Sequence, residues 1–390
     1  MLLKRNTMQN YRLLVVMIPE VSGVSYYRQS MPHEHLSKNF PEFEITYTTG
    51  QELNGKPKEY YKDFQLVIFQ RDLPNEEYVN TVKSMGCVVL LDIDDHWQVP
   101  KHNSSYYDYK KYNLSEKIIK SFVLADHITT TTPYLKEQIK RFTYSGISIL
   151  QNAIDPSIKQ LGIKEILSDK MRFGYMATPN HIEDCKLMKD SIQSLLYDRT
   201  MQGKYHLSLG GFNMDSRLAF EIGGEIVDYE KISKPLRKLM KIEGYKQPFE
   251  EMEEIFTNKG RVKDYSRILS KPVDEFMQGY NELDVCLVPL VDSDFNRCKS
   301  ELKMIEAGWF KKACICSDVI PYNTIDIANF VNNNNKLGFY FAIKYCIENP
   351  HYVENLGNKL HEYVIVNHNL DNTNIFRAEL YKELIDKRND

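Results

Sequence analysis

The segment from Asp284 to Tyr322 contains residues whose types and spacing suit a phosphorylated ligand. Lys299, Lys303 and Glu306 are spaced i, i+4 and i+7, so a helix beginning near Lys299 would place two cations and then a carboxylate on one face. At ~1.5 Å per residue, Lys299 and Glu306 would lie about 10 Å apart along the axis. The cations could neutralise a diphosphate at the helix N-terminus, and the carboxylate could accept both hydrogen bonds of a ribose diol. The alternative is an ordinary amphipathic helix with a surface pair of Lys303 and Glu306.

A second set of titratable side chains follows the apolar run Val88–Leu91: Asp92, Asp94, Asp95 and His96. Carboxylates this close raise the pKa of at least one member when they are desolvated, which suits a general base. Metal-dependent GT-A glycosyltransferases and phosphotransfer enzymes of the haloacid dehalogenase type also use Asp-x-Asp motifs. Neither class accounts for the segment from Asp284 to Tyr322, and a structural, solvent-facing role for the acidic run also stays open.

Short apolar runs alternate with amphipathic runs along both halves of the chain. Near-continuous apolar runs such as LLVVMI and CVVLL suit parallel strands that are buried on both faces. The alternation predicts doubly wound α/β domains with right-handed crossovers. Strands are expected over Arg12–Ile18, Glu44–Thr48, Leu66–Phe69, Val88–Asp92, His127–Thr130, Ser148–Leu150, Arg172–Met176, Tyr205–Leu209, Asp284–Leu290 and Ala313–Ser317.

The chain of 390 residues is long enough for two domains. The alternating pattern restarts after the polar segment 155–170, which predicts tandem Rossmann-like domains over residues 1–160 and 161–350. Helices over 351–390 are expected to pack back towards the N-terminal domain. Other helices are expected over Ser25–Lys38, Asn75–Ser84, Ser115–Leu124, Pro133–Phe142, His181–Leu196 and Lys299–Trp309.

Composition narrows the class of protein. The net charge of −3 argues against a chain-wide electrostatic contact with nucleic acid, and the basic run 231–241 is interpreted as a solvated helix face. Seven cysteines with no Cys-x-x-Cys pair indicate reduced thiols and a cytoplasmic protein. No signal peptide or apolar run of ~20 residues is evident, although peripheral membrane contact stays open.

The segment from Asp284 to Tyr322 resembles the donor-binding signature of GT-B glycosyltransferases, in particular the retaining glycosyltransferase family 4. Those enzymes carry a strand that ends in Pro-Leu, then a loop, Lys-x-x-Glu-Ala, a short turn, and a strand followed by Ser-Asp. The resemblance implies that Glu306 holds the ribose hydroxyls of a nucleotide-sugar. Many members have a glutamate that contacts the donor sugar where this chain has Cys298. The matching residues are Val288-Pro289-Leu290, Asn296, Lys299-Ser300, Lys303, Glu306-Ala307 and Ser317-Asp318, of which Asn296, Lys299, Ser300 and Lys303 would contact the donor.

The start of the C-terminal half carries a second match. Residues 172–181, RFGYMATPNH, resemble the strand, loop and helix that begin the donor domain in these transferases. The resemblance implies that Thr178 and His181 face the diphosphate. A surface histidine at a helix N-terminus is the alternative for His181.

The N-terminal half resembles the acceptor side of such enzymes. The loop after the first strand implies acceptor or phosphate contact by Gly23, with Arg28 as an anion partner. Arg71 follows a strand at its carboxyl end and is also assigned to the acceptor side, with a surface ion pair to Asp72 as the alternative. The acidic run lies on this side too, so Asp94, Asp95 and His96 are assigned to acceptor binding or catalysis.

Together with the residues, the resemblance implies a metal-independent glycosyltransferase with no cofactor, which uses a UDP- or GDP-sugar as donor and retains the configuration of the transferred sugar. The expected acceptor is a saccharide or a lipid-linked saccharide. Two alternatives stay open: a phage-type glycosyltransferase acting on a modified DNA base, and a non-catalytic GT-B-like protein that binds a nucleotide-sugar. A phosphotransfer enzyme using Asp92 and Asp94 with magnesium is a third.

Overall fold

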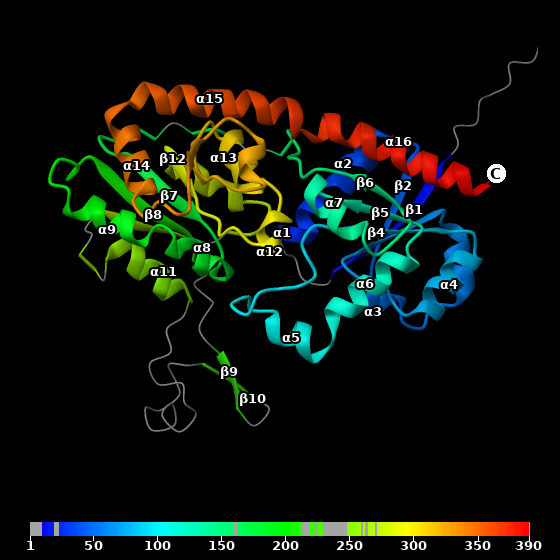
Figure 1. The fold of residues 1–390 in the computed structure, drawn as a ribbon. Helices are drawn as coiled ribbons and strands as arrows, with labels where there is room; N and C mark the ends of the chain where they lie inside the picture. The colour runs from blue at the N-terminus through cyan, green and yellow to red at the C-terminus, as the bar shows by residue number, and fades with distance from the viewer. Residues whose placement is uncertain are drawn as a thin grey trace, which may run out of the picture. The chain divides into compact units, whose positions relative to one another are not determined.

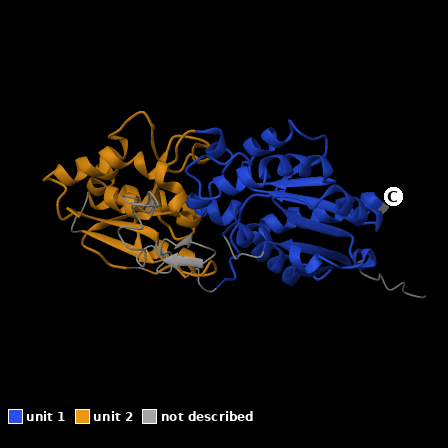
Figure 2. Cartoon of the chain, turned by 90° about the horizontal axis from the view of Figure 1, so that it is seen from below, with its two compact units in different colours: residues 1–159, 293–305, 362–390 blue, residues 160–292, 306–361 orange. Residues whose placement is uncertain are grey.

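The fold is described from a computed structural model (Figure 1), which covers residues 10–18, 23–158, 162–164, 166–212, 219–222, 225–228, 248–258, 260–261, 264–269 and 271–389. The chain divides into two compact units (Figure 2). Unit 1 comprises residues 1–159, 293–305 and 362–390, and unit 2 comprises residues 160–292 and 306–361. Residues 293–305 therefore belong to unit 1, although the sequence places them inside the second domain. The basic run 231–241 lies outside the described residues.

Unit 1 is built on a six-stranded parallel sheet with the strand order β2-β1-β3-β4-β5-β6. Alternate residues of each strand face opposite sides of the sheet. One face packs a core that includes Leu14, Val67 and Val89, and the other packs Leu13 and Leu90 against helices α2 and α16. The strands are β1 (Tyr11–Met17), β2 (Phe43–Thr49), β3 (Leu66–Gln70), β4 (Val88–Ile93), β5 (His127–Thr130) and β6 (Gly146–Ile149).

The helices of unit 1 follow the strands in the order that a doubly wound fold requires. They are α1 (Gly23–Ser25), the π-helix η1 (Tyr26–Ser30), α2 (Met31–Asn39), α3 (Gly50–Leu53), η2 (Lys58–Asp63), α4 (Glu76–Ser84), α5 (Tyr106–Lys111), α6 (Leu114–Leu124), α7 (Pro133–Ile139), α12 (Asp294–Arg297) and α16 (Leu370–Asn389). Several begin at a side-chain cap, as at Asn75 and Thr132, whose oxygens accept from backbone N–H groups of the first turn.

Unit 2 is also built on a six-stranded parallel sheet, but its third strand lies at the sheet edge beside the second, whereas the third strand of unit 1 lies beside the first. Its six parallel strands have the order β11-β8-β7-β12-β13-β14, and a separate antiparallel pair joins β9 (Ala219–Ile222) to β10 (Glu225–Asp228). Gly211 has a φ of +97°, and a Cβ there would lie 2.2 Å from the carbonyl oxygen of Ala177, so this close approach requires glycine. The strands are β7 (Met171–Met176), β8 (Tyr205–Phe212), β11 (Tyr265–Leu269), β12 (Val285–Val288), β13 (Ala313–Ser317) and β14 (Asn329–Val331).

The helices of unit 2 cover its sheet, and two further helices continue from one unit into the other. Those of unit 2 are η4 (Pro179–His181), α8 (Ile182–Lys186), α9 (Lys189–Tyr197), α11 (Pro248–Thr257), η6 (Phe276–Glu282), η7 (Tyr322–Thr324) and α14 (Gly338–Glu348). The division between the units falls inside α13 (Leu302–Trp309) and α15 (Pro350–Asn367). Within the described part of the chain, no helix combines the length and apolar character needed to cross a membrane.

The α/β fold class is confirmed, and the ten expected strands form at or within a few residues of their expected positions. Three details differ. The helix expected from Lys299 begins at Leu302, because the residues before it are fixed by side-chain contacts described below. The helix expected over His181–Leu196 is broken into η4, α8 and α9. Strands β11 and β14 were not expected, since they are short or only partly buried edge elements.

Candidate active site

The strand orders locate a crevice in each unit. In an open α/β sheet, ligands bind beyond the carboxyl ends of the strands where the strand order reverses. In unit 1 this switch point lies between β1 and β3, and in unit 2 it lies between β7 and β12. Several residues that the sequence singles out follow strands of these sheets: Arg71 follows β3, Asp94 follows β4, and Thr178 and His181 follow β7.

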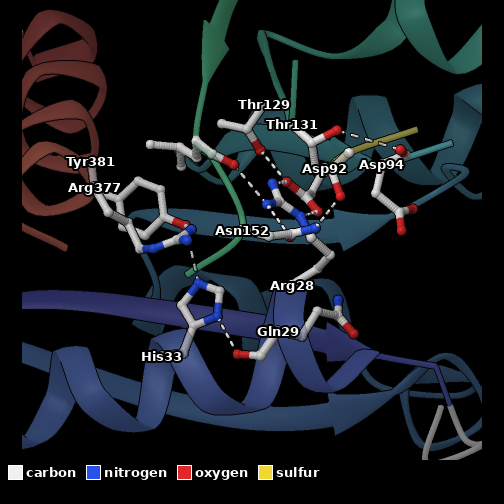
Figure 3. Close-up of polar contacts among 12 residues, drawn as sticks. Arg28, Gln29, His33, Asp92, Asp94, Thr129, Thr131, Asn152, Arg377 and Tyr381 are labelled. Atoms are coloured by element: carbon white, nitrogen blue, oxygen red, sulfur yellow. Dashed lines mark hydrogen bonds and ion pairs between the residues drawn. The ribbon is translucent and has the colours of Figure 1, made fainter. Parts of the chain in front are cut away.

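In unit 1 a buried ion pair joins the segment after β1 to the ends of three other strands (Figure 3). Arg28 is 1% exposed, and its Nε and Nη2 donate to the two carboxylate oxygens of Asp92 at 2.9 and 2.6 Å. Thr129 donates to the same carboxylate at 2.6 Å, and Arg28 Nη1 donates to the carbonyl oxygen of Leu150 at 2.6 Å. The structure therefore places Arg28 inside unit 1 rather than on its surface. Its guanidinium acts there as a structural partner of Asp92.

The acidic run after β4 contains a carboxyl with a perturbed pKa. Burial and the neighbouring Asp95 carboxylate raise the pKa of Asp94 to about 7, which confirms the expected effect of crowded carboxylates. Asp95 is paired with Lys299, whose Nζ lies 3.4 Å from Oδ1. Thr131 donates to the carbonyl oxygen of Asp94 at 3.4 Å (Figure 3). Asp94 is therefore protonated in part at neutral pH and can both donate and accept a proton.

His96 lies beside the same loop. Its Nδ1 accepts a hydrogen bond from the backbone N–H of Gln98 at 3.0 Å, and its ring stacks on Trp97 at 4.5 Å. Burial lowers the pKa of His96, so the neutral ring with its proton on Nε2 is favoured. In this tautomer His96 is a hydrogen-bond donor at Nε2, which suits binding of a hydroxyl oxygen better than abstraction of its proton.

The other acceptor-side residues lie at the switch point of unit 1. Arg71 has a left-handed φ of 73°, and its guanidinium lies over the ring of Tyr109 at 5.9 Å. Such strained backbone is concentrated at functional sites. Gly23 is exposed at the start of α1.

Gln70, which the sequence does not single out, is 5% exposed and neither polar atom of its amide has a hydrogen-bond partner. A polar residue ending the apolar run LVIFQ is the signal that would have found it.

The segment 293–305 carries four of the predicted donor residues and belongs to unit 1. Asn296 is 8% exposed in α12, whose first turn is capped by Ser293. Lys299 and Ser300 precede α13, while Lys303 lies in its first turn. The ladder of Lys299, Lys303 and Glu306 along one helix face therefore does not form as expected, because only the last two lie within the helix.

In unit 2, a buried carboxylate connects the two loops at the switch point. Asp184 is 4% exposed; it accepts from His181 Nδ1 at 2.8 Å and from the backbone N–H of Val291 at 2.8 Å. His181 follows β7 and Val291 follows β12, so both strand ends share this carboxylate. Thr178 is exposed just before η4. The Asp184 contact fixes the orientation of the His181 imidazole.

Glu306 is the second buried carboxylate of unit 2. It is 3% exposed, and the hydroxyl of Tyr280 donates to its Oε2 at 2.7 Å. The Tyr280 ring stacks on Phe310 at 6.2 Å. Tyr280 was not predicted, since it lies in η6, before the donor signature and 26 positions from Glu306. Nearby, Ser317 Oγ accepts from the backbone N–H of Leu290, which fixes the Pro-Leu end of β12.

Among the residues that the structure describes, no group of three or more His, Cys, Asp or Glu side chains is arranged to hold a metal ion. Asp92, the first member of the Asp-x-Asp run, is 3% exposed and is committed to the guanidinium of Arg28. This commitment argues against the use of Asp92 as a magnesium ligand or nucleophile.

Comparisons with known proteins show the fold. No protein-family model matches the sequence, and no curated protein matches it. Sucrose-phosphate synthase from Thermosynechococcus elongatus has a TM-score of 0.59 at 14% identity, over 97% of this chain and 100% of that one. Anabaena HepE in complex with UDP and glucose has a TM-score of 0.55 at 9% identity, over 95% and 99%. The trehalose-6-phosphate synthase OtsA has a TM-score of 0.57 at 10% identity, over 95% and 99%. The chain thus has the GT-B fold of two Rossmann-like domains.

Proposed function

We propose that this protein is a glycosyltransferase that takes a sugar from a nucleotide-sugar donor. The observation that carries the proposal is the hydrogen-bonded set of His181, Asp184 and Val291, which joins both loops at the switch point of unit 2. A helix start and an imidazole held by a carboxylate form a suitable place for a diphosphate. The fold supports the proposal, since HepE is described in complex with UDP and glucose. Another similar structure is described as trehalose-6-phosphate from E. coli bound with UDP-2-fluoro glucose.

The donor would be a UDP- or GDP-sugar. In unit 2, Thr178 and His181 would contact its diphosphate. The resemblance adds Asn296, Lys299, Ser300 and Lys303 as donor-binding residues. Glu306 would accept the ribose hydroxyls, and Tyr280 would hold its carboxylate in one orientation. The two lysines would supply positive charge for the leaving diphosphate, so the proposed transfer needs no metal ion.

The acceptor would be a saccharide or a lipid-linked saccharide that lies against Asp94, Asp95 and His96. We propose retention of configuration, because a same-face displacement needs no side-chain nucleophile. One trehalose-6-phosphate synthase structure is described in terms of glycosyl transfer with retention. In such a reaction the leaving phosphate takes the acceptor proton, and Asp94 and His96 hydrogen-bond the acceptor hydroxyl. In an inverting reaction, ionised Asp94 would instead remove that proton.

A second candidate is a protein that binds a nucleotide-sugar without turning it over. Cys298 favours it, since this residue stands where related enzymes have a glutamate, and it is completely buried in the core of unit 1. It therefore cannot contact a donor sugar. Hydrolysis of a nucleotide-sugar by the wild-type protein, or transfer from it, would exclude this candidate.

The test is a thermal-shift screen against UDP, GDP, ADP, CMP and dTDP sugars with and without EDTA. A ligand that binds only the folded protein raises the unfolding midpoint by mass action. We expect one nucleotide class to raise it despite EDTA, and Glu306→Gln to reduce the affinity about tenfold, because an amide accepts a ribose diol less well than a carboxylate.

Glu306→Gln keeps an oxygen for the Tyr280 hydroxyl, so it separates ligand contact from local packing. Glu348→Gln, in α14 of the same unit, is a control for the loss of a carboxylate. A shift that requires magnesium would contradict the proposal, and no shift from any nucleotide would remove it.

A further inference from the structure

Residues 298–301, within the donor signature, are each held by a different part of unit 1. Cys298 is completely buried in its core, and Lys299 pairs with Asp95 at 3.4 Å. Ser300 Oγ accepts from the side-chain amide of Asn152 at 2.8 Å. Glu301 Oε1 lies 3.6 Å from Nε2 of His368. These contacts explain why α13 begins only at Leu302.

The side chain of Asn152 has one orientation in this network. It is 5% exposed, and its Oδ1 accepts from Nη1 of Arg28 at 3.1 Å, as the close-up in Figure 3 shows. A guanidinium only donates hydrogen bonds, so an inverted amide would place two donors against each other. The buried pair of Arg28 and Asp92 therefore turns the Asn152 amide nitrogen towards Ser300.

The backbone of Asn152 is also fixed. Its carbonyl oxygen accepts from Nδ1 of His368 at 2.9 Å, and His368 is completely buried. Asn152 is thus held through both its side chain and its main chain. A residue held in this way can set the direction of a neighbouring hydroxyl.

The hydrogen bond from Asn152 limits the direction in which the Ser300 hydroxyl proton can point. A serine hydroxyl has one donor and two acceptor positions, and here Asn152 uses an acceptor position. The hydroxyl proton is therefore directed away from the Asn152 amide. Ser300 is partly exposed, and an anionic oxygen is the strongest partner for such a donor.

We propose that Asn152 is a positioning residue of the donor site, which directs the Ser300 hydroxyl proton at a phosphate oxygen of a nucleoside diphosphate. This proposal rests on the proposed function and deepens it. Arg28 and Asp92 act one step further back, by fixing the amide of Asn152.

The test compares UDP with uridine as probes in calorimetric titrations of the full chain. Asn152→Ala and Ser300→Ala should each weaken UDP binding about tenfold, which is the effect of one lost hydrogen bond to a charged group. Uridine affinity should not change, because it has no phosphate. The double variant should be no weaker than either single variant, since both remove the same contact. Asn367→Ala, at an amide that bonds only a helix carbonyl in the same unit, is the matched control.

Asn152→Asp is a second variant that keeps the size of the side chain. Its carboxylate can still accept from Arg28 but cannot donate to Ser300, so it should weaken UDP binding at least as much as Asn152→Ala. Unchanged UDP affinity in Asn152→Ala, additive losses in the double variant, or equal losses for UDP and uridine would each overturn the positioning role. Wild-type protein that binds no nucleoside diphosphate would instead remove the proposed function, and this role with it.

Discussion

The switch points of the two units both lie where the strand order reverses, but their chemistry differs. In unit 1, Arg28 and Asp92 are both nearly inaccessible, and their contacts tie the segment after β1 to β4, β5 and β6. In unit 2, Asp184 is buried, but it binds a partly exposed histidine and a backbone N–H group. The first arrangement satisfies its charges internally, whereas the second leaves an imidazole at the surface beside a helix start.

This difference indicates that the buried ion pair of unit 1 serves stability, whereas the carboxylate of unit 2 orients a side chain for ligand binding. A buried ion pair loses stabilisation when either partner is removed, because the other charge stays without compensation. A carboxylate that orients an accessible histidine instead affects whatever the histidine binds. We therefore expect substitutions of Arg28 and Asp92 to act mainly on stability, and those of Asp184 and His181 to act mainly on ligand binding.

The largest effect is expected from Arg28→Met. Removal of the guanidinium leaves Asp92 buried without a partner, so the free energy of unfolding should fall by about 3–5 kcal/mol. Urea unfolding followed by circular dichroism measures this change. Arg267→Met is the matched control, because Arg267 also binds a carboxylate through two nitrogens, at Glu253, but is 55% exposed. It should cost less than about 1 kcal/mol. Equal losses of unfolding free energy in the two variants would show that burial does not determine how much each ion pair contributes to stability.

An intermediate effect on stability is expected from Asp184→Asn. The amide keeps an oxygen for Val291 but loses the charge of the carboxylate that holds the His181 imidazole, so the free energy of unfolding should fall by about 1–3 kcal/mol. UDP affinity should fall about tenfold, as measured by calorimetry. Glu183→Gln, at the neighbouring and more exposed carboxylate, should change neither quantity appreciably. Loss of stability without loss of affinity would place the two switch points in the same class.

The smallest effect concerns Asp94 and depends on pH. Its pKa of about 7 in the folded protein exceeds the value of ~3.9 expected when unfolded. The group therefore contributes its full stability below about pH 4, and this contribution is lost as the pH rises through about 7. Asp94→Asn should match the wild type at pH 4 and be more stable by about 1–2 kcal/mol at pH 8, after allowance for partial exposure.

Urea titrations at both pH values test this expectation. Asp108→Asn, at an exposed carboxyl of the same unit, controls for the loss of one charge. An Asp94→Asn variant that is less stable at pH 8 than the wild type would mean that the carboxylate is stabilised, not strained, in the folded protein.

Much of the fold could be predicted from the sequence, because a buried parallel strand is marked by its own residues. The run from Val88 to Leu91 is apolar without interruption, and all of β4 is buried. The same local logic predicted that residues such as Asp94 and His181, which follow strands, would lie at carboxyl ends. The raised pKa of Asp94 followed from the crowding of carboxylates along the chain.

The partners of these residues could not be predicted in the same way. Arg28 and Asp92 are 64 positions apart, and Tyr280 and Glu306 are 26 apart. Periodicity reports which side chains are buried, but strand order and crossover geometry decide which distant side chain they meet. The prediction that α13 begins at Lys299 was wrong for the same reason, since contacts from Asp95, Asn152 and His368 fix the residues before it.

The sequence by itself determined the alternating elements, the α/β class and the residue types at the strand ends, because these depend on near neighbours along the chain. Only the tertiary structure decided that Arg28 is buried against Asp92 and that Cys298 enters the core of unit 1. It also decided that the side-chain amide of Asn152 donates to the hydroxyl oxygen of Ser300. The physical reason is that a buried polar group must find a partner, and the folded topology alone determines which partner lies within reach.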